Sequence, residues 1–398
     1  MNPTFRLDQK EDFEIKVTTF FGLEEVLAAE LKKLGGRDVQ VFKRGVSVLG
    51  DMGFLYKINL CLHTALKVLI PITKFRAENE QELYAIIKQI PWEQYISEQN
   101  TLMVESVVNS EVFSHSLFIS QKVKDAIVDR FREKSGKRPS VDLMLPDLRI
   151  YVHIFRNEVS LHFDSSGEPL FKRGYRADKG EAPMKEVLAA GLVKLSTWEP
   201  HQLLIDGMSG SGTIAIEAAL WAANIPPGYY RNEFGFMRWR AYDEALYHKV
   251  YESSIAKISE QNTQIIANEL DERMIQKIQA NVRRAKVEDA VNVNRQSFFD
   301  MIPPRKSGIL ILNPPYGERI PVKEIEEQAK EIGNKLKKDF KGFTAWIITS
   351  NPETIKSIGL KPSRKIQVYN GALDCRFLRY DMYEGSKKAS KNPGWSGS

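Results

Sequence analysis

The sequence predicts an α/β protein in which α+β modules precede a doubly wound, mostly parallel sheet. From about residue 173 onward, short apolar stretches alternate with helical patterns, and loops rich in glycine or proline follow some of those stretches. The first 164 residues instead mix strand-like and helix-like patterns, which is typical of α+β modules. A length of 398 residues suits two or three domains.

The composition is that of a globular protein. Hydrophobic residues make up 42% of the chain and charged residues 27%, with 25 glycines and 18 prolines, which excludes disordered, collagen-like and low-complexity chains. No run of about 18 apolar residues occurs, and charged residues interrupt the N-terminal stretch. We therefore expect neither a membrane span nor a signal peptide.

Cysteine and histidine usage limits the chemistry. Cys61 and Cys375 are too few for a disulfide framework or a four-cysteine zinc site, so a reducing, cytoplasmic location is expected. The six histidines are scattered without metal-ligand spacing, so no metal is expected.

Residues 1–73 are predicted to form a small α+β module. Its elements are a strand at 13–17, a helix at 23–34 that ends at two glycines, a hairpin of 39–42 with 46–49, and a mixed apolar run at 55–72. Residues 74–164 repeat this character as a second module. Its elements are a strand at 102–108, a basic helix capped by Ser120 and ending at Phe131, and a hairpin of 150–154 with 159–163. Residues 165–185 are predicted to be a linker.

Positive charge is concentrated near the end of this N-terminal half. From Gln121 to Arg176 the sequence has twelve Lys and Arg against eight Asp and Glu. On the basic helix the apolar residues share one face, which leaves Lys122, Lys124 and Arg130 largely elsewhere. The charge fits a polyanionic partner such as RNA equally well as a solvated helix face.

Residues 186–385 carry the alternating pattern. Predicted strands lie at 202–206, 264–268, 291–294, 308–312 and 344–348, and predicted helices at 212–223, 271–285 and 322–338. The last two strand-like segments, 365–369 and 375–382, have no helix between them, so we expect an antiparallel hairpin at a sheet edge. Residues 386–398 are predicted to be a disordered tail.

The first candidate site is Asp206-Gly-Met-Ser-Gly-Ser-Gly-Thr213, between a strand and a helix. Its glycines permit a sharp turn, and the helix N-terminus offers free N–H groups. A phosphate loop is excluded because no lysine follows, and the spacing is not that of a dinucleotide fold. A carboxylate at the strand end suits the cationic amino acid part of S-adenosylmethionine, and Met208, Gly210, Gly212 and Thr213 are the other candidate contacts.

Glu269 ends the next strand, in Ala267-Asn-Glu-Leu-Asp271. An acid at that position typically binds ribose hydroxyls in nucleotide-binding sheets. Asp271 is better explained as the cap of the following helix.

The motif Asn313-Pro-Pro-Tyr316 follows the apolar strand at 308–312. Pro314 and Pro315 lack N–H groups, so carbonyl oxygens there are available as acceptors. The side-chain oxygen of Asn313 and a proline carbonyl can together hold an exocyclic amine, while Tyr316 stacks on the ring. An aromatic amine is a poor nucleophile, so orienting it toward an electrophilic methyl group is what catalysis must supply.

With these motifs, the chain resembles the THUMP-containing, class I S-adenosylmethionine-dependent RNA guanine-N2 methyltransferases, especially those that modify large-subunit ribosomal RNA. Further matching segments are 22–25, 123–129, 172–176, 182–185 and 370–374. The resemblance implies a ferredoxin-like module at 1–73, a THUMP module at 74–164 and a Rossmann-like methyltransferase domain at 186–385. It also implies S-adenosylmethionine as cofactor and RNA as partner.

The sequence departs from this family in two places. The bacterial fusion form has a second methyltransferase domain, whereas this chain ends after the first, so one activity is expected. Many relatives have Asp-Phe where this chain has Ser297-Phe298. Ser297 is thus a weaker candidate for the adenine contact, with Asp300 as the alternative.

Two further groups are candidates for RNA contact. Lys172, Arg173 and Arg176 precede the methyltransferase domain and can bridge phosphates. Residues 225–242 interleave aromatics with arginines, which fits either base stacking or a second small core.

The resulting hypothesis is methylation of a guanine N2 amine in 23S ribosomal RNA. Transfer RNA, a non-catalytic RNA-binding assembly factor and adenine N6 in DNA are the alternatives.

Overall fold

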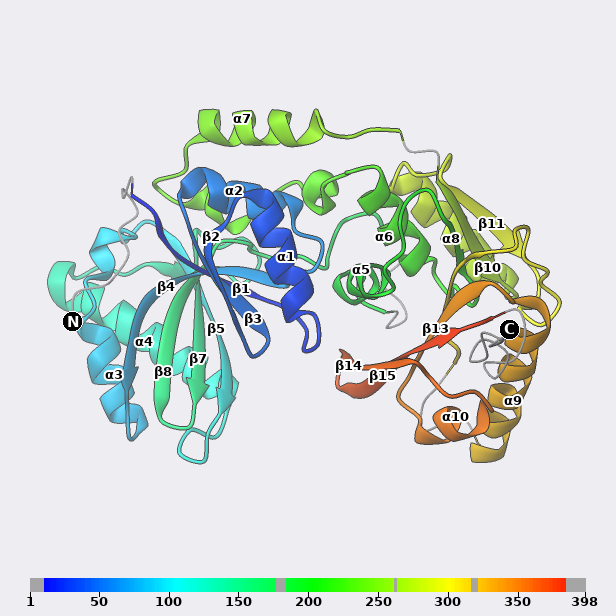
Figure 1. Ribbon diagram of the computed structural model, residues 1–398. Helices are drawn as coiled ribbons and strands as arrows, with labels where there is room; N and C mark the ends of the chain where they lie inside the picture. The colour runs from blue at the N-terminus through cyan, green and yellow to red at the C-terminus, as the bar shows by residue number, and fades with distance from the viewer. Residues whose placement is uncertain (1–10, 177–183, 261–262, 316–320, 384–398) are drawn as a thin grey trace, which may run out of the picture. The chain divides into compact units, whose positions relative to one another are not determined.

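The computed structural model describes residues 11–176, 184–260, 263–315 and 321–383 (Figure 1). They form two compact units. Unit 1 contains the residues up to Thr19, Leu27–Lys172 and Pro227–Ala256, and unit 2 contains Phe20–Val26, Arg173–Pro226 and the residues from Lys257 onward. The predicted tail at 386–398 lies outside the described residues.

Unit 1 is built on one sheet with the strand order β2-β3-β1-β4-β8-β7-β5-β6. The strands are β1 (Phe13–Thr18), β2 (Arg37–Phe42), β3 (Gly45–Gly50), β4 (Lys67–Arg76), β5 (Thr101–Asn109), β6 (Ser140–Val141), β7 (Leu148–Phe155) and β8 (Glu158–Asp164). The helices between them are α1 (Glu24–Leu34, which begins in unit 2), α2 (Met52–Cys61), α3 (Glu80–Gln89), η1 (Trp92–Gln94) and α4 (Ser116–Ser135).

The two predicted N-terminal modules share this sheet. The start of β4, Lys67–Leu69, pairs with β1, and the rest of β4 pairs with β8. The boundary expected between residues 73 and 74 therefore falls inside a strand. The mixed apolar run at 55–72 resolves into α2 and the first part of β4.

Two local expectations in unit 1 are wrong. Helix α4 begins at Ser116, four residues before the predicted cap. Ser120 lies inside the helix, and its hydroxyl lies 2.9 Å from that of Ser106 on β5 instead of binding a backbone amide. The start of the predicted linker is also part of the fold: Ser165 and Ser166 are fully buried, and the Ser165 hydroxyl donates to the Val68 carbonyl at 2.8 Å.

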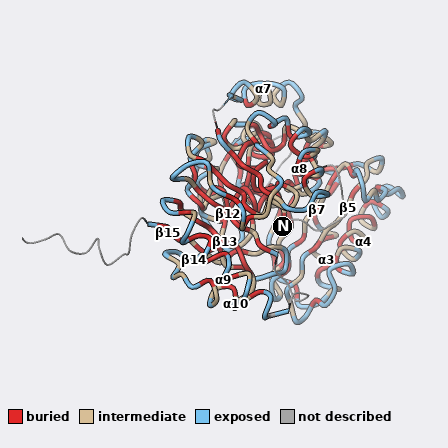
Figure 2. The backbone as a smooth tube through the Cα atoms, turned by 90° about the vertical axis from the view of Figure 1, so that its right-hand side faces the viewer, coloured by how far each residue is buried: buried red, intermediate tan, exposed pale blue. Residues whose placement is uncertain are grey.

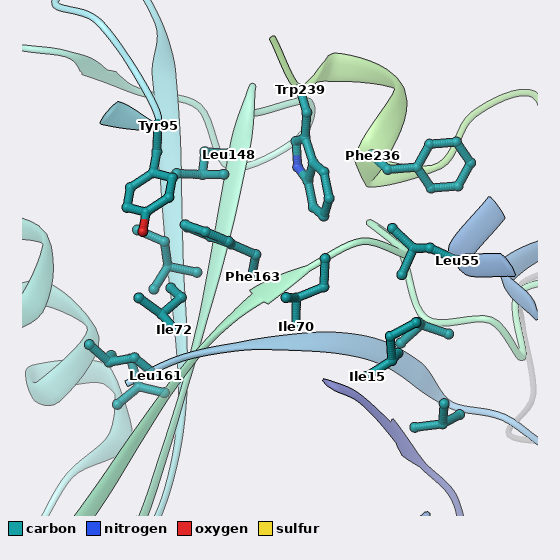
Figure 3. Packing of buried hydrophobic residues seen from close by; sticks show 14 of the residues in the cluster. Ile15, Leu55, Ile70, Ile72, Tyr95, Leu148, Leu161, Phe163, Phe236 and Trp239 are labelled. Atoms are coloured by element: carbon teal, nitrogen blue, oxygen red, sulfur yellow. The ribbon is translucent and has the colours of Figure 1, made fainter. Parts of the chain in front are cut away.

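A segment from the middle of the chain completes the core of unit 1. It contains η2 (Pro227–Tyr230), η3 (Gly235–Arg238) and α7 (Glu244–Ile255). Phe234, Phe236 and Trp239 are buried in the same cluster as residues of β4 and β8. Figure 3 shows Phe236 and Trp239 beside Ile70 and Phe163 of these strands. Of the two interpretations of residues 225–242, a packed core is correct for these three aromatic rings.

Unit 2 has the strand order β11-β10-β9-β12-β13-β15-β14. The strands are β9 (Leu203–Asp206), β10 (Gln264–Glu269), β11 (Val291–Arg295), β12 (Gly308–Leu312), β13 (Phe343–Thr349), β14 (Arg364–Asn370) and β15 (Leu373–Asp381). β9 to β13 are parallel, and β15 is antiparallel to both β13 and β14. The predicted parallel sheet and edge hairpin are therefore both present.

The helices of unit 2 are α5 (Glu186–Leu195), α6 (Thr213–Ala222), α8 (Glu272–Arg284), α9 (Val322–Asp339) and α10 (Pro352–Ser357). Ile332 and Leu336 of α9 lie in the same buried cluster as Leu203, Ile205 and Leu310 of the sheet. Helix α6 packs against β9 and β10. Coverage by helices explains why β12 and β13 are buried along nearly their whole length (Figure 2).

Within the ranges that the structure describes, none of the helices has the length and apolar character needed to cross a membrane.

Candidate active site

The candidate residues of unit 2 meet at the carboxyl ends of three neighbouring strands. Asp206, the last residue of β9, pairs with Ala267 of β10 on one side and with Ile311 of β12 on the other. Glu269 and Asn313 each come two residues later along those strands. The register therefore places all three side chains at the edge where parallel sheets bind ligands.

The glycine loop connects β9 to α6. Gly210 has a φ of +54° and Gly212 a φ of +77°, a region that residues with a side chain rarely adopt. Gly212 is also the N-cap residue of α6, and a Cβ there would lie 3.0 Å from Ile278. The loop thus needs glycine at both positions, and it leads directly into the N-terminus of α6, where free N–H groups favour an anionic group.

Asp206 is fully buried at the end of β9. Neither carboxylate oxygen has a hydrogen-bond partner of good geometry among the described residues, and the Ser209 hydroxyl donates instead to the Asp206 main-chain oxygen at 2.9 Å. Burial raises the pKa of Asp206 to about 7, against smaller lowering effects of Ser209 and the Ala215 amide. A buried carboxylate without a partner is costly, which is the expected state of a group that awaits a cation.

Glu269 holds the glycine loop in place. One carboxylate oxygen accepts the Gly210 N–H at 2.8 Å, and the other accepts the N–H groups of Leu270 at 2.8 Å and Asp271 at 3.1 Å. Asp271 accepts the Arg273 N–H at 2.8 Å and caps α8, as expected. The contact of Glu269 with a ribose stays a prediction.

Asn268 is a site residue that sequence reasoning missed. Its side-chain amide donates to the carbonyls of Gly207 at 3.1 Å and Gln296 at 3.2 Å, and its main-chain carbonyl accepts the Ser209 N–H at 3.0 Å. Asn268, on β10, thereby ties together the loops after β9 and β11. The one signal in the sequence was a polar amide directly after the apolar residues Ile265–Ala267, and its burial is visible only in the structure.

Asn313 and Pro314 follow β12. The side-chain oxygen of Asn313 is buried and has no hydrogen-bond partner among the described residues. Pro314 is buried and Pro315 is exposed. Tyr316 lies outside the described residues, so its stacking role stays a prediction.

The remaining cofactor candidates occupy less distinctive positions. Met208 packs on the hydrophobic core of unit 2, and the Ser297 hydroxyl accepts the Phe299 N–H at 3.2 Å in a local turn. Asp300, the alternative to Ser297, is exposed. The structure gives no preference between them for an adenine contact.

In the basic segment before α5, two arginines that were predicted to contact phosphates form ion pairs within unit 2. Arg173 is 1% exposed and pairs with Glu217 at 3.4 Å, and the Tyr175 hydroxyl donates to the same carboxylate at 3.1 Å. Arg173 therefore does not fit the prediction of a phosphate contact, because its charge is buried. Arg176 pairs with Glu186 at 2.8 Å and donates to the Thr213 hydroxyl at 3.1 Å, which ties it to the start of α6.

The predicted RNA-binding cations of unit 1 also have partners. Arg130 donates two hydrogen bonds of 2.8 Å to Glu93 and a third, at 2.9 Å, to the carbonyl of Lys88 near the end of α3. Hydrogen bonds from Arg130 are the main cause that lowers the pKa of Glu93 to about 2. Lys122 lies 5.2 Å from the Tyr84 ring centre, and Lys124 and Lys172 form ion pairs with neighbouring acids, Asp125 and Glu168. Of this group, Lys172 remains more than half exposed.

Family models match most of the chain. Residues 173–379, more than half of the sequence, match the model described as RMKL-like, methyltransferase domain. The chain belongs to the RMKL-like methyltransferase family. In this member of the family, residues 77–164 match the THUMP domain and residues 14–69 the RlmL ferredoxin-like domain. These matches confirm the predicted fold class.

Curated relatives of this RMKL-like protein are named as RNA methyltransferases. A putative RNA methyltransferase of Synechocystis sp. is 38% identical over 366 residues, which cover 91% of this chain and 95% of that protein. A ribosomal RNA large subunit methyltransferase K/L of Syntrophotalea carbinolica is 37% identical over 91% of this chain and 53% of that protein. The chain thus spans about half the length of the K/L relatives.

Solved structures have the same fold over nearly the full chain. A putative methyltransferase crystallised with SAH is 29% identical, has a TM-score of 0.84, and covers 95% of this chain and 100% of its own. A predicted N6-adenine-specific DNA methylase of Listeria monocytogenes is 30% identical, has a TM-score of 0.82, and covers 94% and 97%.

Proposed function

We propose that this protein methylates the exocyclic N2 amine of a guanine in large-subunit ribosomal RNA, with S-adenosylmethionine as the cofactor. The K/L relatives are named for that RNA, and the THUMP match supports an RNA substrate. The observation that carries the chemistry is a pair of buried acceptors without hydrogen-bond partners among the described residues, Asp206 and Asn313, after adjacent parallel strands.

The residues at the strand ends fit the cofactor. S-adenosylmethionine supplies an electrophilic methyl group and carries a cationic α-ammonium. Once ionised, Asp206 pairs with that ammonium, and the attraction between the two charges offsets the free-energy cost of burying the carboxylate. Glu269 is assigned to the ribose, the Gly210–Thr213 loop to the amino acid part, and Met208 and Ser297 to the adenine side. The methyltransferase neighbour crystallised with SAH supports this choice of cofactor.

Asn313 and Pro314 are the proposed catalytic contacts with the target base. The unpartnered oxygen of Asn313 and the carbonyl of Pro314 each accept one amine hydrogen, which orients the nitrogen lone pair and disperses the positive charge that develops on it. No strong base is needed, because the proton leaves after methylation. The target guanine leaves its stack to reach these groups, and we assign Tyr316 to stacking on it.

Lys122, Lys124 and Lys172 are the proposed phosphate contacts among the sequence-predicted cations. Lys172 is supported best, because its ion pair is exposed and exchanges readily with a polyanion, whereas Lys122 and Lys124 are half-buried. Arg130 and Arg173 are assigned a structural role. We place the enzyme in the cytoplasm. Adenine in DNA stays as an alternative substrate because one solved neighbour is named as a DNA methylase.

The test is methyl transfer from radiolabelled S-adenosylmethionine to separate pools of unmodified ribosomal RNA, transfer RNA and DNA, followed by nucleoside analysis. We expect N2-methylguanosine from the large-subunit ribosomal RNA pool. Asn313→Ala is expected to lower turnover about 100-fold or more, in the range seen when one preorganised polar group is removed from an active site. N2-methylguanosine from transfer RNA alone would keep the chemistry and make transfer RNA the substrate. N6-methyladenine from DNA would contradict the proposal. Wild-type turnover of a folded Asn313→Ala variant contradicts the mechanism.

A further inference from the structure

Unit 1 contains a hollow of about 230 Å³ that the proposed chemistry does not use. Tyr95, Ile96 and Leu148 form its apolar wall. Residues 238–240, which begin at the last residue of η3, line another part of it. All of these residues belong to unit 1. The three residues Arg238-Trp-Arg240 come from the segment whose other aromatic rings fill the core.

Trp239 contributes an unused hydrogen-bond donor to this hollow. Its side chain is 5% exposed, and its indole nitrogen is buried without a partner among the described residues. Figure 3 shows this nitrogen on the side of the ring that faces Leu148, which is itself part of the wall. A buried indole N–H normally has a partner, so this donor points to an acceptor supplied from outside.

Asp147 contributes an acceptor that the fold holds in place. One of its carboxylate oxygens accepts the Thr101 N–H at 2.7 Å, the Thr101 hydroxyl at 3.1 Å and the Asn100 side-chain amide at 3.3 Å. Both Asp147 and Asn100 line the hollow. The interior therefore presents a fixed carboxylate and an amide as well as the indole donor.

Two cations flank the buried tryptophan in sequence. Arg240 is exposed, and Arg238 is about one-third exposed and paired with Glu233. The cations favour a polyanion around the hollow, whereas the carboxylate of Asp147 inside it disfavours a phosphate there. A planar, uncharged group with both donors and acceptors on its edge satisfies both conditions.

We propose that this hollow binds one unpaired nucleobase of the RNA substrate, with Arg238 and Arg240 on the flanking phosphates. An acceptor atom of the base accepts a hydrogen bond from the Trp239 N–H, and an N–H group of the base donates to Asp147. Tyr95 and Leu148 cover the apolar surface of the base. Single-stranded RNA is generally recognised through unstacked bases in this way. The proposal rests on RNA being the substrate, and it does not depend on which nucleotide is methylated.

The experiment measures binding of the full chain, without cofactor, to a fluorescein-labelled 12-nucleotide single-stranded RNA of mixed sequence and to the same strand in a duplex. Trp239→Phe keeps an aromatic ring and removes the N–H together with the five-membered ring of the indole, so the unchanged binding of the duplex serves as the check that the variant is folded. Arg240→Gln removes a charge at an exposed position, so it leaves the fold intact. Arg37→Gln, an exposed arginine on β2, is the matched control. A second strand with 4-thiouridine at each uridine locates the contact by photocrosslinking.

We expect Trp239→Phe to weaken binding of the single strand roughly 3- to 10-fold, the effect of one hydrogen bond, and to leave duplex binding unchanged. Arg240→Gln weakens binding and lowers the slope of log K against log salt by about one, while Arg37→Gln binds as the wild type does. The crosslink falls on the peptide that contains residues 238–240.

Wild-type affinity in both pocket variants, or a crosslink confined to other peptides, overturns this inference and leaves the methyltransferase proposal standing. Failure of the wild type to bind any RNA overturns both. Methylation of DNA alone overturns RNA as the substrate, and this inference with it, even if the variants lose affinity for RNA.

Discussion

At the scale of single residues, Asp206 determines how cofactor binding depends on pH. Burial raises its pKa to about 7, so in the free protein the group is largely protonated below neutrality. Binding the cationic ammonium requires the ionised form. We therefore expect the affinity for S-adenosylmethionine to fall up to tenfold for each pH unit below about 7 and to level off above it. Titration calorimetry between pH 5.5 and 8.5 measures this profile.

Asp206→Asn is the control for that profile, and its stability has a predictable sign. The folded-state pKa of about 7 exceeds the unfolded value of about 3.9, so the folded protein binds more protons between these pH values and its stability falls as pH rises through that window. The variant loses this pH dependence. It is expected to bind cofactor weakly at every pH and to melt at a higher temperature than the wild type at pH 8. A flat affinity profile for the wild type would contradict the role of Asp206.

At the scale of elements, the approach of α9 to α10 depends on one glycine. A Cβ at Gly333 of α9 would lie 1.8 Å from the backbone oxygen of Ile358, just after α10. Backbone cannot move aside as a flexible side chain does, so Gly333→Ala is expected to destabilise the protein by about 1–3 kcal/mol. Gly53→Ala in α2 is the matched control, because there the added Cβ meets side-chain atoms at 3.4 Å and beyond. Urea unfolding distinguishes the two, and equal stability of both variants would contradict the close packing.

The elements also show what sequence patterns can predict. The strands that carry the site were predictable because parallel strands with helices on both faces are continuously apolar, as in β9 and β12. Their end residues were predictable because a polar residue directly after such a strand stands out. Asn268 was missed because its role depends on carbonyls of Gly207 and Gln296, which only the tertiary fold brings together.

Contacts between residues far apart in the sequence were the second kind of feature that sequence patterns did not predict. Arg173 was predicted to be a surface cation because its neighbours in the sequence do not show that Glu217, 44 residues later, is buried beside it. The start of α4 was missed because the cap residue, His115, makes no side-chain hydrogen bond that a sequence pattern encodes. In the same way, the continuous sheet of unit 1 depends on β4 pairing with β8, which follows it by about 80 residues.

At the scale of the whole molecule, the chain leaves unit 1 and re-enters it twice, so sequence order and structural units do not coincide. The second return, Pro227–Ala256, lies between α6 and β10 of the methyltransferase sheet in sequence, yet its aromatic rings belong to the core of unit 1. Phe236 is fully buried there and stacks on Tyr56 with ring centres 4.4 Å apart. The stability of unit 1 therefore depends on a segment that the linear order assigns to the catalytic domain.

This dependence predicts where a mutation in that segment acts. Phe236→Ala removes a buried ring and is expected to cost about 3–5 kcal/mol, with the loss confined to unit 1. Hydrogen exchange read by mass spectrometry should show faster exchange in α2, β4 and β8, with β9 to β12 unchanged. The matched variant Phe298→Ala, in the core of unit 2 and stacked on Phe340, should show the reverse pattern. Faster exchange in β9 and β10 of Phe236→Ala, with β4 and β8 still protected, would show that the segment supports the methyltransferase unit instead.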